Sequence, residues 1–221
     1  MFTIIFDMDG VISDTQKVHS QIESDLLKSS GVFITPDEIT QRFAGVRTAD
    51  FFIDLLKHKN CDVNTLLARK WLLMRESVAE HVESIDGAIN LIKTLHAQGR
   101  KLAIASASNS DYVHTVLHTL HVHDYFGAII SGDMVSNGKP DPEIFLLAAK
   151  KLGAQPNECV VIEDGISGMT AACTAGMHCI GLVSDLADQV PATVKITSMH
   201  NALDVLMLIE MSASAESRLL I

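Results

Sequence analysis

The chain has 221 residues, of which 48% are hydrophobic, and these values predict a globular protein with one large domain or two modest ones. Its 17 basic and 27 acidic residues give a formal net charge of -10 at pH 7. That charge opposes nonspecific binding to nucleic acid and to anionic membrane surfaces, so we expect neither as a partner. An anionic substrate must then be held by locally placed cations.

No apolar run in the sequence approaches the roughly 18 residues that a membrane-spanning helix needs. Acidic side chains stand near the amino terminus, where a signal peptide would carry an apolar segment behind positive charge. The four cysteines form no CxxC pair, which indicates reduced thiols rather than a zinc site or a disulfide framework. We expect a cytoplasmic protein that is a monomer or a weak homodimer.

The first predicted strand covers residues 2–6 and ends at Asp7 and Asp9, which are followed by Gly10. In an open α/β sheet, ligands bind just beyond the carboxyl ends of the strands. With one residue between them, the two carboxylates can face one cavity, and the glycine permits a sharp turn. Such a pair suits a nucleophile beside a general acid/base, although Asp and Gly are also ordinary turn residues.

From about residue 102 onward, apolar strands alternate with helical stretches. The predicted strands cover residues 102–105, 128–130, 159–162 and 178–182. This alternation predicts an α/β fold with a Rossmann-like, mostly parallel sheet. The last residues, 211–221, lack clear periodicity, so we expect a partly frayed end.

The segment between the first two strands contains several helical patterns and no strand candidate; one pattern, Val18, Ile22 and Leu26, ends at Gly31. We therefore expect a helical cap domain over residues 16–83, inserted into an α/β core formed by residues 1–15 and 84–221. A cap over the carboxyl ends of the strands would exclude water and select the substrate.

Three further motifs follow predicted strands. The turn Ser106–Ser110 precedes a helix, where hydroxyls and backbone N–H groups can bind an anion, although such a turn can also cap the helix. Lys139 follows the third strand and could neutralise a phosphoryl group. Glu163 and Asp164 follow the fourth strand, and carboxylates from two adjacent strand ends form an oxygen-rich site that suits Mg²⁺.

The order and spacing of these motifs resemble the haloacid dehalogenase superfamily of phosphotransferases. The resemblance extends over essentially the whole chain, and the helical insert resembles the C1 cap found in β-phosphoglucomutase and in small sugar-phosphate phosphatases. Dehalogenases and phosphonate hydrolases of this group are expected to lack an acid at the position of Asp9. The presence of Asp9 therefore favours phosphoryl chemistry on a small phosphorylated substrate.

The resemblance implies a role for each motif. Asp7 is expected to attack phosphorus and form an aspartyl-phosphate, while Asp9 protonates the leaving oxygen and then activates water. The expected phosphate-binding residues are Ser106, Ala107 and Lys139. The expected Mg²⁺ site contains Asp7, the backbone carbonyl of Asp9, Glu163 and Asp164, with Glu163 acting through water or by orienting other groups.

The sequence leaves a phosphatase and a β-phosphoglucomutase as alternatives. Thr15, His19 and the serine turn resemble the mutase, and His19 could steady the Asp9 hinge unless it is an ordinary helix-surface histidine. Arg47 could hold a distal phosphate or a sugar oxygen in a bidentate grip. It stands one position earlier than in the mutase, and Asn109-Ser110 replaces an expected Lys-Asn. Both departures favour the phosphatase.

Lys70 could supply another distal anchor, but we interpret it as an exposed helical lysine. A third alternative is a noncatalytic protein that binds a phosphorylated metabolite, which the joint presence of Asp7, Asp9, Lys139 and Asp164 disfavours.

A histidine cluster lies outside these motifs. His114, His118 and His121 recur at helical spacing, and together with His123 they could form a zinc site. No catalytic carboxylate accompanies them and they lie outside the expected cleft, so we favour an ordinary surface interpretation.

Overall fold

The structure is a computed structural model that describes residues 1–219. Its centre is a six-stranded sheet with the order β3-β2-β1-β4-β5-β6, in which every neighbouring pair is parallel. The strands are Thr3–Phe6 (β1), Leu102–Ala105 (β2), Ala128–Ile130 (β3), Cys159–Glu163 (β4), His178–Leu182 (β5) and Val194–Ile196 (β6). The predicted α/β fold with a Rossmann-like sheet is confirmed.

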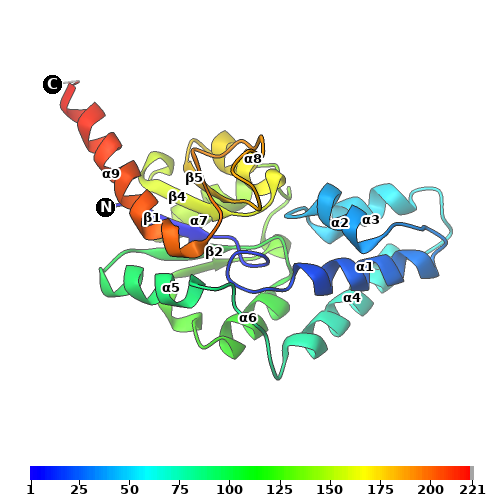
Figure 1. The fold of residues 1–221 in the computed structure, drawn as a ribbon. Coiled ribbons are helices and arrows are strands. Elements are labelled where there is room, and N and C mark those ends of the chain that lie inside the picture. The colour runs from blue at the N-terminus through cyan, green and yellow to red at the C-terminus, as the bar shows by residue number, and fades with distance from the viewer. Residues whose placement is uncertain (220–221) are drawn as a thin grey trace.

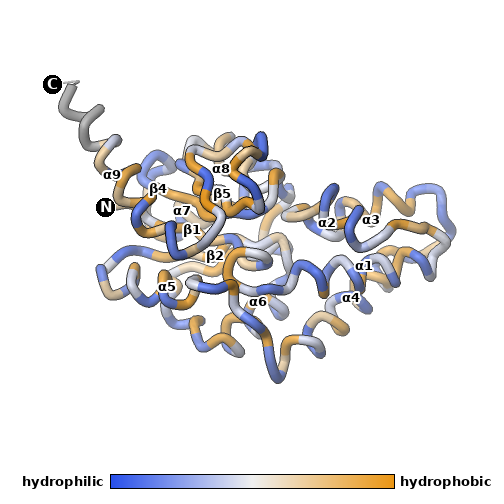
Figure 2. The backbone as a smooth tube through the Cα atoms, in the orientation of Figure 1, coloured by the Kyte–Doolittle hydropathy of each residue, from blue (hydrophilic) through white to orange (hydrophobic). Residues whose placement is uncertain are grey.

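Strand β1 lies in the middle of the sheet and is buried on both faces. Ile4 and Phe6 pack into the apolar cluster on one face, and Ile5 packs into the cluster on the other. This double burial explains the uninterrupted apolar sequence, since a half-exposed strand would alternate polar and apolar residues. Figure 2 shows the same property as hydrophobic colouring along the central strands.

Helices cover both faces of the sheet (Figure 1). Three contribute to the cluster on one face: Ala88–Ala97 (α5), Ser110–Thr119 (α6) and Ala202–Leu219 (α9). Two contribute to the cluster on the opposite face: Glu143–Leu152 (α7) and Ile166–Thr174 (α8). Short 3-10 turns connect several elements: His123–Tyr125 (η1), Gly132–Met134 (η2), Pro156–Glu158 (η3) and Met199–Asn201 (η4).

Four helices lie between β1 and α5 and extend away from the sheet (Figure 1). They are Gln16–Ser29 (α1), Pro36–Phe43 (α2), Thr48–Leu56 (α3) and Val63–Val78 (α4). Their apolar side chains form a separate core that includes Leu27, Phe52 and Leu56. The helical content of the insert agrees with the expectation, while the exact division into residues 1–15 with 84–221 and residues 16–83 stays a prediction.

The insert leaves and rejoins the core through two adjacent segments. The backbone N–H of Asp14 donates to the carbonyl of Glu83 over 2.8 Å, and that of Ile85 donates to the carbonyl of Ile12 over 2.9 Å. The two crossings therefore form one narrow, hydrogen-bonded neck beside Asp9.

Two features differ from the sequence-based expectations. Strand β6 was not predicted, because it has only three residues and a central lysine. Helix α9 continues to Leu219, so the frayed end expected from residue 211 is not observed up to that point; residues 220–221 lie outside the described residues. Within residues 1–219, every helix is too short or too polar to cross a membrane. The cytoplasmic location stays a prediction.

Candidate active site

The predicted site residues meet at one edge of the sheet. Strand β1 pairs with β2 on one side and with β4 on the other, so the segments that follow these three strands are neighbours. Asp7 follows β1, Ser106 follows β2, and Glu163 is the last residue of β4. The chain after β3 brings Lys139 to the same edge, where it contacts Asp7 and Glu163.

Lys139 joins two buried carboxylates. Its Nζ lies 2.5 Å from Asp7 Oδ1 and 2.9 Å from Glu163 Oε2. Burial alone would lower the lysine pKa, but the two carboxylates outweigh it and raise the pKa above the ordinary value. Lys139 is therefore a permanent cation that sits beside Asp7.

Asp7, Glu163 and Asp164 each bring a carboxylate oxygen within 4.8 Å of the others. Burial, followed by the charge of Glu163, raises the pKa of Asp164 to about 8. The pKa of Asp7 is raised as well, first by burial and then by Glu163. A divalent cation would offset this repulsion and keep both groups ionised.

One carboxylate oxygen in this group has no protein partner. Asp164 Oδ1 is buried and accepts no hydrogen bond from the described residues. Gly10 lies against the same carboxylate, since a Cβ there would fall 2.1 Å from Asp164 Oδ2. A buried acceptor without a donor is costly unless a ligand satisfies it, so these residues fit an oxygen-preferring ion such as Mg²⁺.

The expected Mg²⁺ ligands differ in how many of their oxygens already accept hydrogen bonds from the protein. Both oxygens of Glu163 are occupied, by Lys139 and by the backbone N–H of Gly165 at 3.1 Å. The Asp9 carbonyl accepts a hydrogen bond of 3.0 Å from the Gln16 side chain. Glu163 is therefore better placed to hold Lys139 than to contact an ion directly, and its expected part in the Mg²⁺ site stays a prediction.

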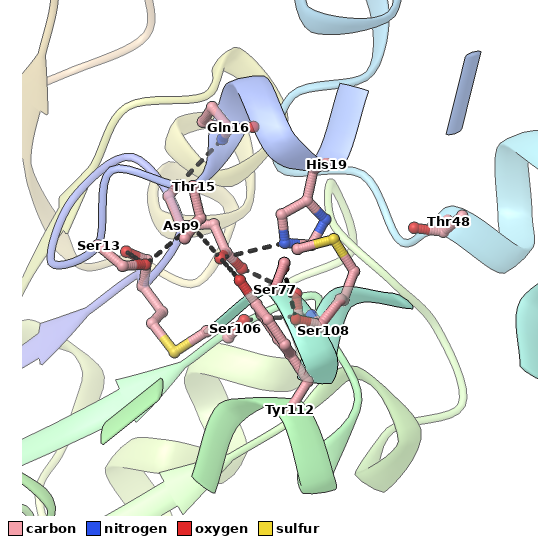
Figure 3. Close-up of polar contacts among 12 residues, drawn as sticks. Asp9, Ser13, Thr15, Gln16, His19, Thr48, Ser77, Ser106, Ser108 and Tyr112 are labelled. Atoms are coloured by element: carbon pink, nitrogen blue, oxygen red, sulfur yellow. Dashed lines mark hydrogen bonds and ion pairs between the residues drawn. The ribbon is translucent and has the colours of Figure 1, made fainter. Parts of the chain in front are cut away.

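The Asp9 carboxylate accepts four side-chain hydrogen bonds (Figure 3). Oδ1 accepts from Thr15 at 2.6 Å and Tyr112 at 3.0 Å, and it lies 3.2 Å from His19 Nε2; Oδ2 accepts from Ser108 at 2.8 Å. Burial alone would raise the pKa of Asp9, but His19 and the hydroxyl donors lower it well below its usual range. The sequence pointed to Thr15 and His19 and missed Ser108 and Tyr112.

The serine turn is arranged around Ser106, which is buried and whose Oγ accepts from the backbone N–H of Ser108 at 3.1 Å. The cap of α6 is Asn109, whose side chain accepts from the backbone N–H of Tyr112. Ala107 lines the cavity that also contains Asp7 and Asp9. Asn109 rather than Ser106 therefore caps the helix, and the expected role of Ser106 and Ala107 in binding phosphate stays a prediction.

Lys70 is buried, so its interpretation as an exposed helical lysine is wrong. Its Nζ lies 2.7 Å from Glu23, hydrogen-bonds Thr48 and sits 3.9 Å from the centre of the Trp71 ring. Helix α4 packs against α1, α3 and α6, and this packing buries Lys70, which also lines the cavity beside Asp7 and Asp9. Glu23 and Thr48 are site-lining residues that the sequence analysis did not identify.

Arg47 connects the helical insert to the core. Its guanidinium makes two hydrogen bonds with Asp50, at 3.1 and 2.8 Å, and donates to three backbone carbonyls at 3.2 Å each. The three carbonyls belong to Gly132, Val135 and Ser136. All five guanidinium N–H groups are thus engaged by protein, and this geometry does not favour the expected grip on a distal substrate group.

The space beside Asp7 and Asp9 is a cavity of about 40 Å³, which is enough for water but not for a sugar phosphate. A larger groove of about 820 Å³ runs between α2 and the loop after β4, with Arg42 on one wall and Asp164 on the other. Residues of the insert therefore line the small cavity beside Asp7 and Asp9, and the larger open space next to Asp164 is this groove.

The geometry and the comparisons define the class of protein. Residues 4–182 match the family model of the haloacid dehalogenase-like hydrolases. The chain belongs to this family, which confirms both the resemblance seen in the sequence and the expectation of an enzyme.

Two of the similar proteins are named for reactions of phosphorylated sugars. The chain is 31% identical over 179 residues to fructose-1-phosphate phosphatase YqaB of Escherichia coli, which covers 80% of this chain and 94% of that protein. It is 30% identical over 193 residues to β-phosphoglucomutase of Bacillus subtilis, covering 82% of this chain and 83% of that protein.

Two further comparisons concern fold and length. A crystal structure of β-phosphoglucomutase from Clostridium difficile has the same fold, with a TM-score of 0.84, 22% identity and coverage of 97% of this chain and 99% of that one. The chain is also 32% identical over 193 residues to the chloroplastic protein SUPPRESSOR OF QUENCHING 1 of Arabidopsis thaliana. That match covers 85% of this chain but spans only 18% of the length of the Arabidopsis protein.

Proposed function

We propose that this chain is a Mg²⁺-dependent phosphatase that hydrolyses a small phosphorylated metabolite, of the sugar-phosphate class, through an aspartyl-phosphate on Asp7. The observation that carries the proposal is the meeting of Asp7, Lys139 and Asp164 at one edge of the sheet, with Asp164 Oδ1 buried and unpartnered among the described residues. Relatives named as a phosphatase and a mutase of phosphorylated sugars support the substrate class.

In the first step, a carboxylate oxygen of Asp7 bonds to phosphorus as the bond between phosphorus and the leaving oxygen breaks. Lys139 stays cationic beside Asp7 and balances charge on the transferring group. Ser106 and Ala107 hold the phosphoryl group through the Ser106 hydroxyl and backbone N–H groups at this turn. Mg²⁺ bound by Asp7, Asp164 and the Asp9 carbonyl would supply further positive charge.

In the second step, water attacks phosphorus, its proton passes to Asp9, and phosphate leaves Asp7 as a free carboxylate. The four hydrogen bonds to Asp9 keep it ionised, which is the form that accepts this proton. To donate a proton to the leaving oxygen in the first step, Asp9 must first be protonated. The hydrogen bonds from Thr15 and His19 oppose this protonation, and movement of these two residues with α1 when substrate binds would weaken both bonds.

Hydrolysis is favoured over the mutase reaction because Arg47 and Lys70, the two residues that could bind a second phosphate, are both engaged by other protein groups. Arg47 uses all of its N–H groups on protein, and Lys70 is paired with Glu23 and Thr48. A mutase must hold a second phosphate while the bisphosphate reorients, and neither cation is available for that. The mutase stays the second candidate because of the 30% identity to β-phosphoglucomutase.

The test is Mg²⁺-dependent phosphate release from a panel of sugar phosphates, including β-glucose 1-phosphate with and without glucose 1,6-bisphosphate. Asp7→Asn is the matched variant, because it keeps the shape of the side chain and removes the nucleophile. We expect release by the native chain and loss of about two orders of magnitude or more in the variant. Bisphosphate-stimulated glucose 6-phosphate formation with little release would identify the mutase, and ligand binding without turnover would identify a sensor.

A further inference from the structure

Three histidines gather on the core at a place separate from the catalytic carboxylates. His114 and His118 lie one turn apart on α6, and His123 begins the following turn η1. A ring nitrogen of each lies within 4.8 Å of the others. The cluster consists of nitrogen donors, whereas the catalytic edge offers carboxylate and carbonyl oxygens.

The end of α6 explains why His123 joins the cluster and His121 does not. His121 has a φ of 56°, in the left-handed region that non-glycine residues seldom adopt. The backbone N–H of Val122 then donates to the carbonyl of Leu117 over 3.0 Å, which closes the helix end. The chain reverses at this point and brings His123 back against the helix, so His123, rather than the helically spaced His121, completes the group of three.

The distances are close to those of a coordinated metal. His114 Nδ1 lies 3.1 Å from His123 Nε2, and two imidazoles on a tetrahedral zinc ion, each about 2.0–2.1 Å from it, stand about 3.3 Å apart. The rings of His118 and His123 are stacked, with centroids 4.1 Å apart. His118 is exposed, and one of its ring nitrogens lies within 4.8 Å of a ring nitrogen of each of the other two histidines.

A carboxylate already orients one of these rings. Asp124 Oδ1 lies 3.0 Å from His123 Nδ1, so the opposite nitrogen, Nε2, faces His114. Metal-binding histidines commonly donate their second ring N–H to a carboxylate in this way, which fixes the ring and its tautomer. Burial, together with His123 and His118, also lowers the pKa of His114 and favours the neutral imidazole that binds metals.

We propose that His114, His118 and His123 bind one divalent transition-metal ion of the zinc type through three imidazole nitrogens. Imidazole suits Zn²⁺, Co²⁺, Ni²⁺ and Cu²⁺, while Mg²⁺ prefers oxygen ligands, so the two sites differ in the ion they select. The ion joins α6 to η1. Helix α6 also carries Tyr112, the donor to Asp9, so the ion stabilises a helix that supports the catalytic edge.

The test is calorimetric titration of the full chain with Zn²⁺ in the presence of excess Mg²⁺, with the shift of the thermal unfolding midpoint as a second readout. We expect one Zn²⁺ per chain, with stabilisation that grows with Zn²⁺ concentration. His123→Gln and His118→Gln should each raise the Kd at least about tenfold. His118 is exposed, so its substitution leaves the fold unaffected.

Two controls locate the bound ion. His121→Asn removes a neighbouring imidazole, keeps a residue that tolerates positive φ, and should leave the Kd unchanged. Asp164→Asn alters the carboxylate site and should also leave it unchanged. The proposal is overturned if Zn²⁺ does not bind saturably or if binding disappears in Asp164→Asn. It is also overturned if both His118→Gln and His123→Gln bind Zn²⁺ with the Kd of the native chain.

Discussion

His19 Nε2 lies 3.2 Å from Asp9 Oδ1, so the first helix of the insert contacts the proposed acid/base directly. Burial opposes ionisation of Asp9, and the His19 imidazole is the largest of the influences that reverse this effect and lower its pKa. The position of the insert and the protonation of Asp9 are therefore linked through one side chain.

The first prediction concerns His19→Asn, which weakens this link. Removal of the imidazole should raise the Asp9 pKa toward its ordinary value, and the acid limb of the kcat profile should move to higher pH. The measurement is kcat against pH from acid to neutral conditions. His58→Asn, a change at an exposed histidine of the same insert, should leave the profile in place; an equal shift in both variants would contradict the assignment.

The second prediction uses Gly10, which has a φ of +89° and a Cβ position 2.1 Å from Asp164 Oδ2. Gly10→Ala should displace the Asp164 carboxylate and weaken Mg²⁺ binding at least tenfold, in addition to adding about 1 kcal/mol of backbone strain. The Mg²⁺ concentration at half-maximal activity measures the effect.

The control for this substitution is Gly99→Ala. Gly99 has a similar φ of +75° and nothing within 4 Å of its Cβ position, so this variant carries the strain without the collision. It should lose stability by a comparable amount and keep the Mg²⁺ requirement of the native chain. A loss of Mg²⁺ affinity in both variants would mean that strain alone disturbs the site.

The strand-end residues could be predicted from the sequence because parallel strands bring their carboxyl ends to one edge of a sheet. Asp7, Lys139 and Asp164 each come after a predicted strand, and β1 lies between β2, which Ser106 follows, and β4, which ends at Glu163. The donors to Asp9 were harder to find, since Tyr112 lies in the first turn of α6, away from any strand end, and its hydroxyl reaches back to Asp9.

Lys70 shows where helical periodicity stops being informative. A periodic pattern predicts which residues share a face of a helix, but it does not say what that face meets. The buried side of α4 carries a lysine that is tolerated because Glu23 lies 2.7 Å away. Only the packing of α1 against α4 reveals this pair.

The third prediction follows from the raised pKa of Asp164, about 8 against 3.8 for an unperturbed carboxyl. Between these values the metal-free folded chain holds a proton that the unfolded chain has lost, so its unfolding free energy falls as pH rises through this window. Mg²⁺ favours the ionised carboxylate. The stabilisation by Mg²⁺ should therefore increase from pH 5 to pH 8, by at most about 1.4 kcal/mol of unfolding free energy per pH unit, and it is followed as a growing Mg²⁺-induced rise in Tm.

Thermal unfolding with and without Mg²⁺, at several pH values, measures this effect. Asp164→Asn removes both the titrating group and an ion ligand, so its Mg²⁺ response should be small and nearly independent of pH. A constant Mg²⁺ response of the native chain over the same range would be incompatible with Asp164 as a ligand.

The fourth prediction concerns the contact between Arg47 and the loop that leads to Lys139. Arg47 donates to the carbonyls of Gly132, Val135 and Ser136, and a Cβ on Gly138 would fall 3.1 Å from Arg47 Cβ. Arg47 thus connects the insert to the loop that leads to Lys139, the proposed phosphate-binding lysine.

Arg47→Ala should remove these hydrogen bonds between the insert and the loop, because three carbonyls lose their donor together. We expect kcat/KM to fall about tenfold, the equivalent of about 1.4 kcal/mol. Amide hydrogen exchange should become faster across residues 132–139. Arg47→Lys should recover little, since one ammonium cannot reproduce the planar fork of donors. Arg69→Ala removes the same charge from an exposed position on α4 and should change neither measurement. If Arg47→Ala kept native kcat/KM and native exchange in this loop, the position of Lys139 would have to be independent of the insert.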